Sequence, residues 1–204
     1  NGLSHGAILQ SGGADAASPG DTAARTARQF LDAAAVGNAT DLLRLDTDTL
    51  LAAQRKGIAS AGRKSPFRPV VDGTTLPDWP LARIARSRGK PVPLLLGGNR
   101  DEAVFFGASK ADPADVTQKD LTNMSLEGFG AIYGHYDPLV ADPAQRRYAA
   151  LTDEEYWIPT LRLAETVSRR GGRTWLYRFE LPNKAGPFAG HVPHGAELPF
   201  VWDN

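Results

Sequence analysis

The sequence predicts an α/β protein, because short apolar strands alternate with segments of helical periodicity. The clearest strand is 92–96, whose apolar residues run without interruption, as is typical of a parallel strand buried on both faces. Ala7–Gln10 indicates a second short buried strand, and the alternation of side chains in 174–181 indicates a third. These observations together predict a sheet of parallel strands joined by helices.

The first of these strands lies very near the start of the chain. The residues before it show neither an initiator Met nor the charged-then-apolar pattern of a signal peptide. A strand needs neighbours to pair with, so we expect the chain to begin inside a larger domain. Where that domain is located in the cell cannot be read from these residues.

The stretch between the first two strands predicts small helices. Apolar residues at three- and four-residue spacing indicate a helix over 23–34, with Asp21 or Thr22 as its cap. Two shorter helices are expected between 42 and 57, and the three together resemble a helical hairpin or small lid. Four prolines within 65–80 then predict an extended segment.

Glycines and one helix-start pattern organise the second half of the chain. Several helices are expected between 108 and 142. The glycines expected to separate them are Gly128, Gly130 and Gly134. Thr152-x-x-Glu155 has the form of a capping box, so a helix is expected to begin there. After the third strand, 182–199 is expected to be a loop.

The composition excludes several classes of protein. Lys+Arg and Asp+Glu both number 23, so the basic excess typical of nucleic-acid binding is absent and no nucleic-acid partner is expected. The longest apolar run, 92–96, is far too short to span a membrane. The lack of cysteine excludes disulfides, iron–sulfur clusters and thiolate zinc sites. One soluble, loop-rich domain, or a piece of one, fits these limits.

Two acids follow the best strand at the point where ligands and catalytic groups gather in open parallel sheets. Asp101 and Glu102 come directly after the turn that ends this strand. A carboxylate in this position can accept the ring N–H of a histidine and stabilise its protonated form. The alternative is that both acids are solvated residues of an exposed turn.

A second candidate region is the loop that carries His191, His194 and Glu197. Histidine exchanges a proton near neutral pH, so a loop histidine is a candidate general base. The alternative is a structural or surface histidine. A metal site made of these three residues is a further alternative, although Pro193 breaks the regular spacing that such ligands need.

The sequence contains no nucleophile elbow in its usual context and no nucleotide-binding motif. A nucleophile elbow places Gly-x-Ser-x-Gly on a turn from a strand to a helix. Ser4 lies between Gly2 and Gly6, but the segment that follows it is the expected strand 7–10 and not a helix, so no elbow is expected there. Gly-x-Gly-x-x-Gly after a strand and the phosphate-binding loop are both missing, which argues against nucleotide-dependent enzymes. No cofactor is therefore expected.

Four segments carry longer motifs in a fixed order along the chain. They are Ala-Ile-Leu-Gln-Ser-Gly at 7–12, Phe-Arg-Pro-Val-Val-Asp-Gly at 67–73, Leu-Leu-Leu-Gly-Gly-Asn-Arg-Asp-Glu at 94–102 and His-Gly-Ala-Glu-Leu-Pro-Phe-Val-Trp at 194–202. In this order they resemble motifs of the type B carboxylesterase and cholinesterase family. That family has the α/β-hydrolase fold, so the resemblance implies a partial α/β-hydrolase fold of central parallel strands with helical lid insertions.

The resemblance implies a role for each of the candidate residues. Glu102 matches the acid and His194 the histidine of a catalytic triad, in the chain order of this fold. Ser11 and Glu197 match a buried polar pair that holds the histidine loop. Ala103 departs from the family, which usually has glycine after the acid, and we expect it to restrict the backbone of that turn.

The family is more than twice as long as this chain. The resemblance therefore implies that 1–204 is the middle to C-terminal portion of a single α/β-hydrolase domain. The nucleophilic serine and the oxyanion-hole loop would precede this portion. Strand 92–96 is then expected to lack a partner on at least one side until that segment joins it.

The implied function is a serine carboxylesterase acting on small esters. The isolated chain is expected to be inactive, because it lacks the serine that would form the acyl-enzyme. A non-catalytic cholinesterase-like binding domain is the alternative in a different functional class.

Overall fold

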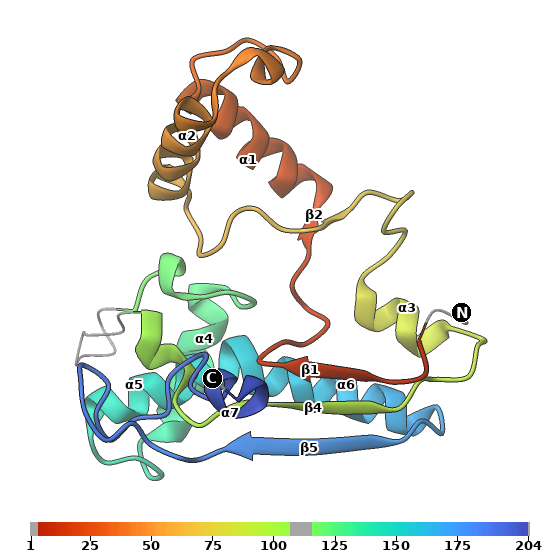
Figure 1. Ribbon diagram of the computed structural model, residues 1–204, viewed down its shortest axis with the longest axis vertical. Coiled ribbons are helices and arrows are strands. Elements are labelled where there is room, and N and C mark those ends of the chain that lie inside the picture. The colour runs from red at the N-terminus through yellow and green to blue at the C-terminus, as the bar shows by residue number, and fades with distance from the viewer. Residues whose placement is uncertain (1–3, 107–115, 204) are drawn as a thin grey trace. The chain divides into compact units, whose positions relative to one another are not determined.

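The computed structural model describes residues 4–106 and 116–203, which fold as two compact units (Figure 1). The larger unit takes the chain up to Asp15 and again from Pro80 onward. The smaller unit comprises Ala16–Trp79. All residues singled out above as candidates for chemistry belong to the larger unit.

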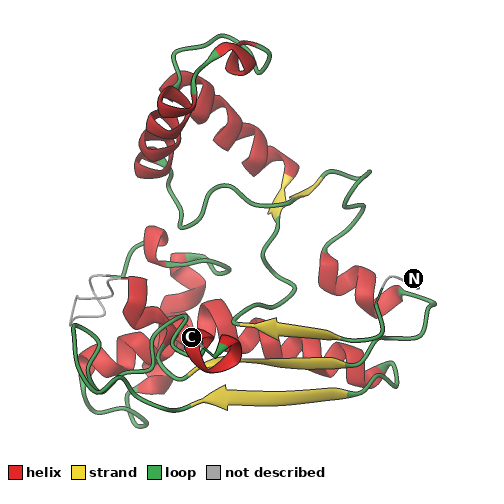
Figure 2. Ribbon diagram, in the orientation of Figure 1, coloured by secondary structure: helices red, strands yellow, loops and turns green. Residues whose placement is uncertain are grey.

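A three-stranded parallel sheet runs through the larger unit, as Figure 2 shows. It contains β1 (Ala7–Gln10), β4 (Leu94–Asn99) and β5 (Thr174–Phe179), in the order β1-β4-β5. The expectation that the best strand lacks a partner on one side is wrong, because β4 is central and pairs on both sides. Among the described residues, the outer sides of β1 and β5 are the free edges.

The central strand begins at Leu94 and not at Val92 as expected. Proline at 93 has no N–H to donate to a neighbouring strand, so regular pairing starts after it. The carbonyl of Pro93 still accepts the Ala7 N–H at 3.0 Å, and this bond brings β1 into register. The strand continues through two glycines to Asn99, which places the acid turn directly at its carboxyl end.

Two helices, α3 (Pro80–Arg86) and α6 (Ile158–Arg169), build the core on one face of this sheet. Leu94 and Leu96 of the central strand are buried there with Leu163. Because side chains alternate between faces, the residue between the two leucines points the other way and is partly exposed.

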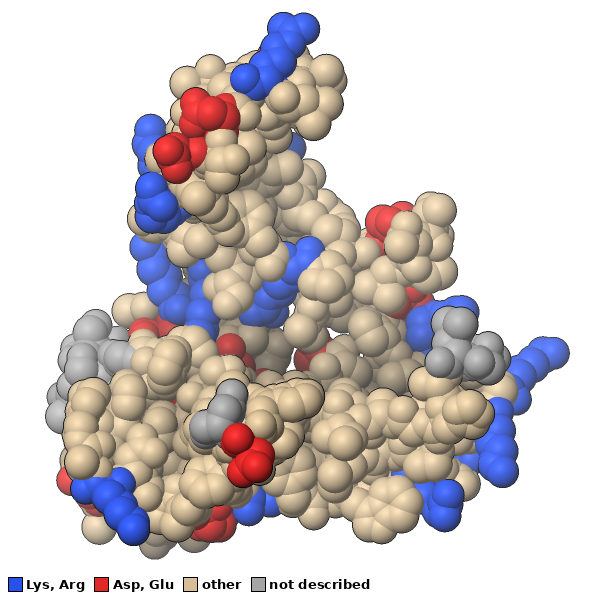
Figure 3. Space-filling model, viewed as in Figure 1, with Lys and Arg blue, Asp and Glu red and all other residues tan. Residues whose placement is uncertain are grey.

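The opposite face of the sheet carries an open apolar groove. The short helix α7 (Leu198–Trp202) forms one wall of it, and the groove holds about 570 Å³. Ile8 on the sheet and Trp202 on the helix are 68% and 69% exposed. Most of the surface of the larger unit in Figure 3 is uncharged. The face of the sheet opposite α3 and α6 is therefore apolar and open to solvent at this groove.

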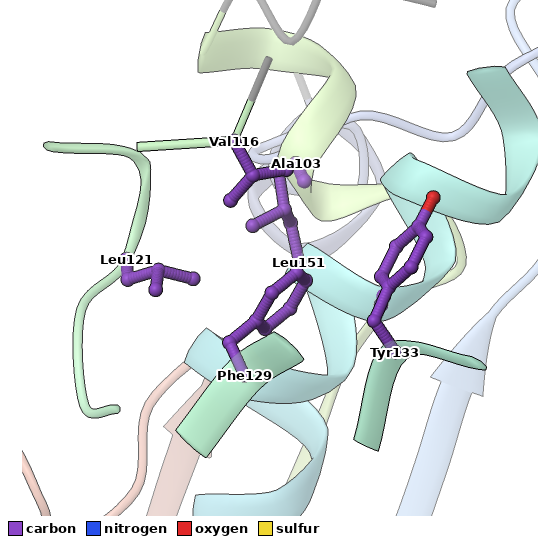
Figure 4. Close-up of a cluster of buried hydrophobic side chains, with 7 residues drawn as sticks. Ala103, Val116, Leu121, Phe129, Tyr133 and Leu151 are labelled. Atoms are coloured by element: carbon purple, nitrogen blue, oxygen red, sulfur yellow. The ribbon is translucent and has the colours of Figure 1, made fainter. Parts of the chain in front are cut away.

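A second core lies beneath the acid turn (Figure 4). It is built from the 3₁₀-helical turn Glu102–Phe106, from α4 (Leu126–Tyr133) and from α5 (Pro143–Thr152). Its buried members are Ala103, Val116, Leu121, Phe129, Tyr133, Ala150 and Leu151. Short 3₁₀ turns at Gln118–Asp120 and Gly134–Tyr136 connect these elements. Ala103 thus anchors the acid turn in a hydrophobic cluster.

The expected helix breaks in this region are partly wrong. Helix α4 runs through Gly128 and Gly130, because Ser125 caps its N-terminus and Phe129 and Tyr133 bury one face of it. Gly134 does end the helix. The first part of the region, 107–115, lies outside the described residues.

The expected capping box at Thr152 and Glu155 is also wrong. Helices α5 and α6 are joined by a π-helical turn, Asp153–Trp157, so both residues lie within one continuous helical run. Asp142 caps the start of this run by accepting the Gln145 N–H. The Thr152 hydroxyl accepts the backbone N–H of Ala103 at 3.1 Å and so binds the helix to the acid turn.

The smaller unit is a helical hairpin, as its apolar spacing predicts. Helices α1 (Gly20–Ala33) and α2 (Thr47–Ser60) pack together, with a 3₁₀ turn at Asp41–Arg44 between them. Strands β2 (Ser18–Pro19) and β3 (Val70–Val71) form a short parallel ladder beside them.

The predicted cap of the first helix is wrong. Helix α1 begins at Gly20 with Pro19 in the capping position, because the ladder holds the chain extended up to that residue. Asp21 lies inside the first turn, where it pairs with Arg25. No helix of the described residues has the length and hydrophobicity needed to cross a membrane.

Candidate active site

The carboxylate of Glu102 is the centre of the site. It is fully buried at the start of the turn after β4. Its Oε1 accepts the Ser11 hydroxyl at 2.5 Å and the Asn99 backbone N–H at 2.6 Å. Its Oε2 lies 2.6 Å from Nδ1 of His194. Because a buried carboxylate is costly unless it is hydrogen-bonded, these three partners explain how the fold accommodates it.

Local backbone geometry makes room for this carboxylate. A Cβ atom on Gly98 would lie 2.8 Å from Glu102 Oε1, so this position of the strand needs glycine. Ser11 has a φ of +54°, a left-handed conformation that a side-chain-bearing residue adopts at a cost of about 1–2 kcal/mol. That conformation accompanies the hydroxyl bond to the acid, and strain of this kind is typical of functional sites.

The histidine loop is attached to the same turn by its neighbour Asp101. The Asp101 N–H donates to the Val192 carbonyl at 3.0 Å, and its Oδ2 accepts the Val192 N–H at 2.9 Å. Arg100 donates to Oδ2 of the same acid and to the Gly190 carbonyl. These bonds join the loop and the turn over a sequence separation of about ninety residues.

The imidazole of His194 is half-buried and lies against carboxylates. The pKa of this imidazole is raised above its usual value of 6.5, chiefly by its hydrogen bond to Glu102, while burial opposes the shift. The charges of Glu102, Glu197 and Glu155 also raise the pKa. The next residue, Gly195, has a φ of +81°, which glycine adopts freely. The loop can therefore turn back immediately after the histidine.

Glu197 accepts hydrogen bonds from a different set of partners. One oxygen accepts the Asn99 side-chain amide at 2.5 Å and the other accepts the Gln10 amide at 3.2 Å. The sequence predicts Ser11 and Glu197 as one polar pair. The structure assigns Ser11 directly to Glu102, and Asn99 connects the two carboxylates through its backbone and its side chain.

The two loop histidines face different acids. His191 Nδ1 lies 3.6 Å from Asp101 Oδ2, whereas His194 bonds to Glu102. Among the residues that the structure describes, no group of three or more His, Asp or Glu side chains is arranged to hold a metal ion. The geometry thus favours two histidine–carboxylate pairs over a shared metal site.

Three members of the site were not singled out from the sequence. Gln10 and Asn99 are the last residues of β1 and β4, and each donates to the buried Glu197. A polar residue at the end of an apolar strand was the available signal. Tyr156 lies in the helix behind the site, with its ring centroid 5.4 Å from that of His194. Its sequence spacing gives no hint of this contact.

The arrangement is suited to proton transfer. Because an ionised carboxylate can only accept, Nδ1 of His194 carries the proton in the bond to Glu102. The other ring nitrogen, Nε2, is then free to take a proton from a reacting group. Glu102 would hold the ring and stabilise the imidazolium that forms.

The chain is similar to known proteins along its whole length. The sequence profile of the carboxylesterase family matches residues 1–204. The para-nitrobenzyl esterase of Bacillus subtilis is 32% identical, over 100% of this chain and 42% of that protein. The acetylcholinesterase of Bungarus fasciatus is 26% identical, over 67% of this chain and 26% of its own length. The chain thus spans less than half the length of these curated relatives.

The fold comparison gives the same result. A solved structure of PNB esterase superposes with a TM-score of 0.75 at 27% identity, covering 100% of this chain and 44% of that one. The parallel strands and flanking helices are accordingly part of an α/β-hydrolase fold. With a family match along its whole length, this chain belongs to the type B carboxylesterase family.

Proposed function

We propose that the chain is the middle to C-terminal portion of a serine carboxylesterase and supplies two members of its catalytic triad. Glu102 is the acid and His194 is the base. The observation that carries this proposal is the 2.6 Å bond between the buried Glu102 carboxylate and His194 Nδ1. The acid precedes the histidine in the chain, which is the order of α/β-hydrolase triads.

The proposed reaction needs a serine from an upstream segment of the same protein. His194 takes the serine proton as the oxygen attacks the ester carbonyl, and the resulting imidazolium is stabilised by Glu102. The imidazolium then returns the proton to the leaving alcohol, which leaves an acyl-enzyme. Water then attacks the acyl-enzyme, with His194 again as the base. The carboxylic acid product is released and the serine regains its proton. The substrate class is a small carboxylic ester.

The open side of the sheet supports the proposal that another segment of the same protein packs against it. The outer side of β1 is a free edge among the described residues, and Ile8 and Trp202 are exposed around the apolar groove. Free edges and apolar faces of this kind are typically covered in a complete domain. Residues 1–204 are therefore proposed as one part of a single α/β-hydrolase domain.

Labelling with a fluorophosphonate probe tests this proposal, because the probe reacts covalently with an activated serine. We expect the complete protein to be labelled and the 204-residue chain to remain unlabelled. A labelled isolated chain would show that its own serines suffice. An unlabelled complete protein, folded by circular dichroism, would favour the alternative of a non-catalytic cholinesterase-like binding domain.

A further inference from the structure

The helical run behind the site contains a π-helical turn, and its sequence explains where the irregularity lies. Pro159 has no N–H and cannot donate the regular helix bond to the carbonyl four residues earlier, at Glu155. The π turn Asp153–Trp157 lies at this point. Such turns interrupt α-helices in short pieces and are frequent at functional sites.

This turn presents Tyr156 to the imidazole of His194. The two rings lie with centroids 5.4 Å apart and planes inclined by 33°. Phe106 reaches the same imidazole at 5.4 Å, but it is 46% exposed whereas Tyr156 is only 7% exposed. Tyr156 is therefore the aromatic neighbour of His194 that is held inside the protein.

The phenol of Tyr156 keeps its proton near neutral pH, because its pKa is raised. Burial raises its pKa above the usual value, and the charges of Glu155 and Glu102 raise it further. A side-chain hydrogen bond with Glu155 contributes to the raised pKa as well. The contact with His194 is thus made by a neutral, fixed ring.

The turn is held on both sides by parts of the site itself. Before it, Thr152 accepts the N–H of Ala103, the residue after the triad acid. After it, Pro159 packs so closely on Gly13 that a Cβ atom there would overlap the proline. Tyr156 is consequently fixed relative to the segments that carry Glu102 and Ser11.

A carboxylate within the turn fixes it to a third segment. Glu154 is buried, and its side chain accepts backbone N–H groups of Thr122, Asn123 and Met124. Three backbone donors on one carboxylate leave this residue little freedom. The π turn is therefore a rigid support and not a mobile loop.

We propose that Tyr156 is a positioning residue for His194, an inference that rests on the proposed esterase function. One hydrogen bond to Glu102 fixes Nδ1 but leaves the imidazole able to swing about that bond. The buried tyrosine ring limits this swing and keeps water away from the Glu102–His194 bond. Nε2 is then held where an incoming serine hydroxyl can use it.

The test is a set of variants in the complete esterase. Tyr156→Leu removes the aromatic face, and we expect kcat to fall about 10- to 100-fold, as for a small misplacement of a catalytic group, with KM little changed. Tyr156→Phe keeps the ring and should retain kcat close to wild type. If Tyr156→Leu does not fold, Tyr156→Met fills the space with a flexible chain and carries the same expectation.

Tyr133→Leu is the matched control, because Tyr133 is a similarly buried tyrosine that packs on Phe129 and Tyr136. The folded control should keep its kcat. An equal loss of kcat in Tyr133→Leu, or full activity in folded Tyr156→Leu, would overturn the proposal.

A proton NMR measurement separates this inference from the proposed function. The Nδ1–H proton of His194 in its bond to Glu102 should give a far-downfield resonance, to be assigned by its absence in His194→Gln. We expect this signal in wild type and Tyr156→Phe, and its loss to solvent exchange in Tyr156→Leu. An inactive wild type would refute the esterase function, whereas an unchanged signal in Tyr156→Leu would refute the positioning role.

Discussion

Two histidine–carboxylate pairs lie where the histidine loop meets the acid turn, and they differ in the distance between their groups and in the burial of their acids. His194 and Glu102 are joined at 2.6 Å, and the acid has no exposed surface. His191 and Asp101 are 3.6 Å apart, beyond hydrogen-bond length. Asp101 and Glu102 are neighbours in the sequence, yet only Glu102 is hydrogen-bonded to its histidine.

The partners of the two acids explain this difference. Glu102 turns inward, where it meets a hydroxyl, a backbone N–H and the imidazole. Oδ2 of Asp101 accepts from Arg100 and from the backbone N–H of Val192, so this oxygen holds the loop. One turn therefore carries an acid that orients a histidine and a second acid that fixes the loop on which that histidine lies.

The largest expected effect comes from breaking the two pairs at their histidines. In the complete protein, His194→Ala removes the proposed general base, and we expect kcat to fall by about 10⁴-fold or more, as when a triad member is lost. His191→Ala should leave kcat within a few-fold of wild type. Steady-state hydrolysis of a chromogenic short-chain ester measures both. Equal losses in the two variants would remove the distinction between the pairs.

The acids should give a smaller and more informative difference. Glu102→Gln keeps the shape but removes the charge, and triad enzymes lose up to about 10⁴-fold in kcat from such a change. The same change removes the main cause of the raised pKa of His194. Since the base must be unprotonated, the acid limb of the kcat/KM profile should move to lower pH.

Asp101→Asn is the matched comparison for that change. It retains an acceptor for the Val192 N–H but weakens the bond to Arg100. We expect a modest loss of activity and an acid limb at its wild-type position, because Glu102 still faces His194. A shift of the acid limb as large as in Glu102→Gln would show that the two acids act on the same proton.

The sequence predicts much of this arrangement because the relevant segments are locally encoded. The apolar run at 92–96, the two acids after it and the glycine after His194 are all visible in the printed residues. Each depends on strand burial or turn geometry within a few positions. The three parallel strands and the acid and histidine candidates follow from such local signals.

The remaining features depend on contacts that local patterns do not encode. Thr152 and Glu155 match a capping box, but helix α5 already begins at Pro143, so tertiary packing overrides the pattern. Asn99 connects two carboxylates that come from distant parts of the chain. Nothing in the spacing of either acid reveals which side chain will lie between them.

The smallest expected effect is on the pH dependence of stability. A histidine whose pKa is raised in the folded state stabilises the fold when it is protonated. That contribution is complete below the ordinary pKa of 6.5 and is lost as the pH rises through the raised folded-state value. His194 is 37% exposed, so solvent screening should keep the contribution small.

Urea unfolding of the complete protein over this pH range, for wild type and His194→Gln, measures the contribution. We expect the stability difference between them to narrow as the pH rises above 6.5. His191→Gln should behave as wild type does, because it leaves the His194–Glu102 bond intact. A difference that stays constant across the range would mean that Glu102 binds the neutral and the protonated imidazole equally well.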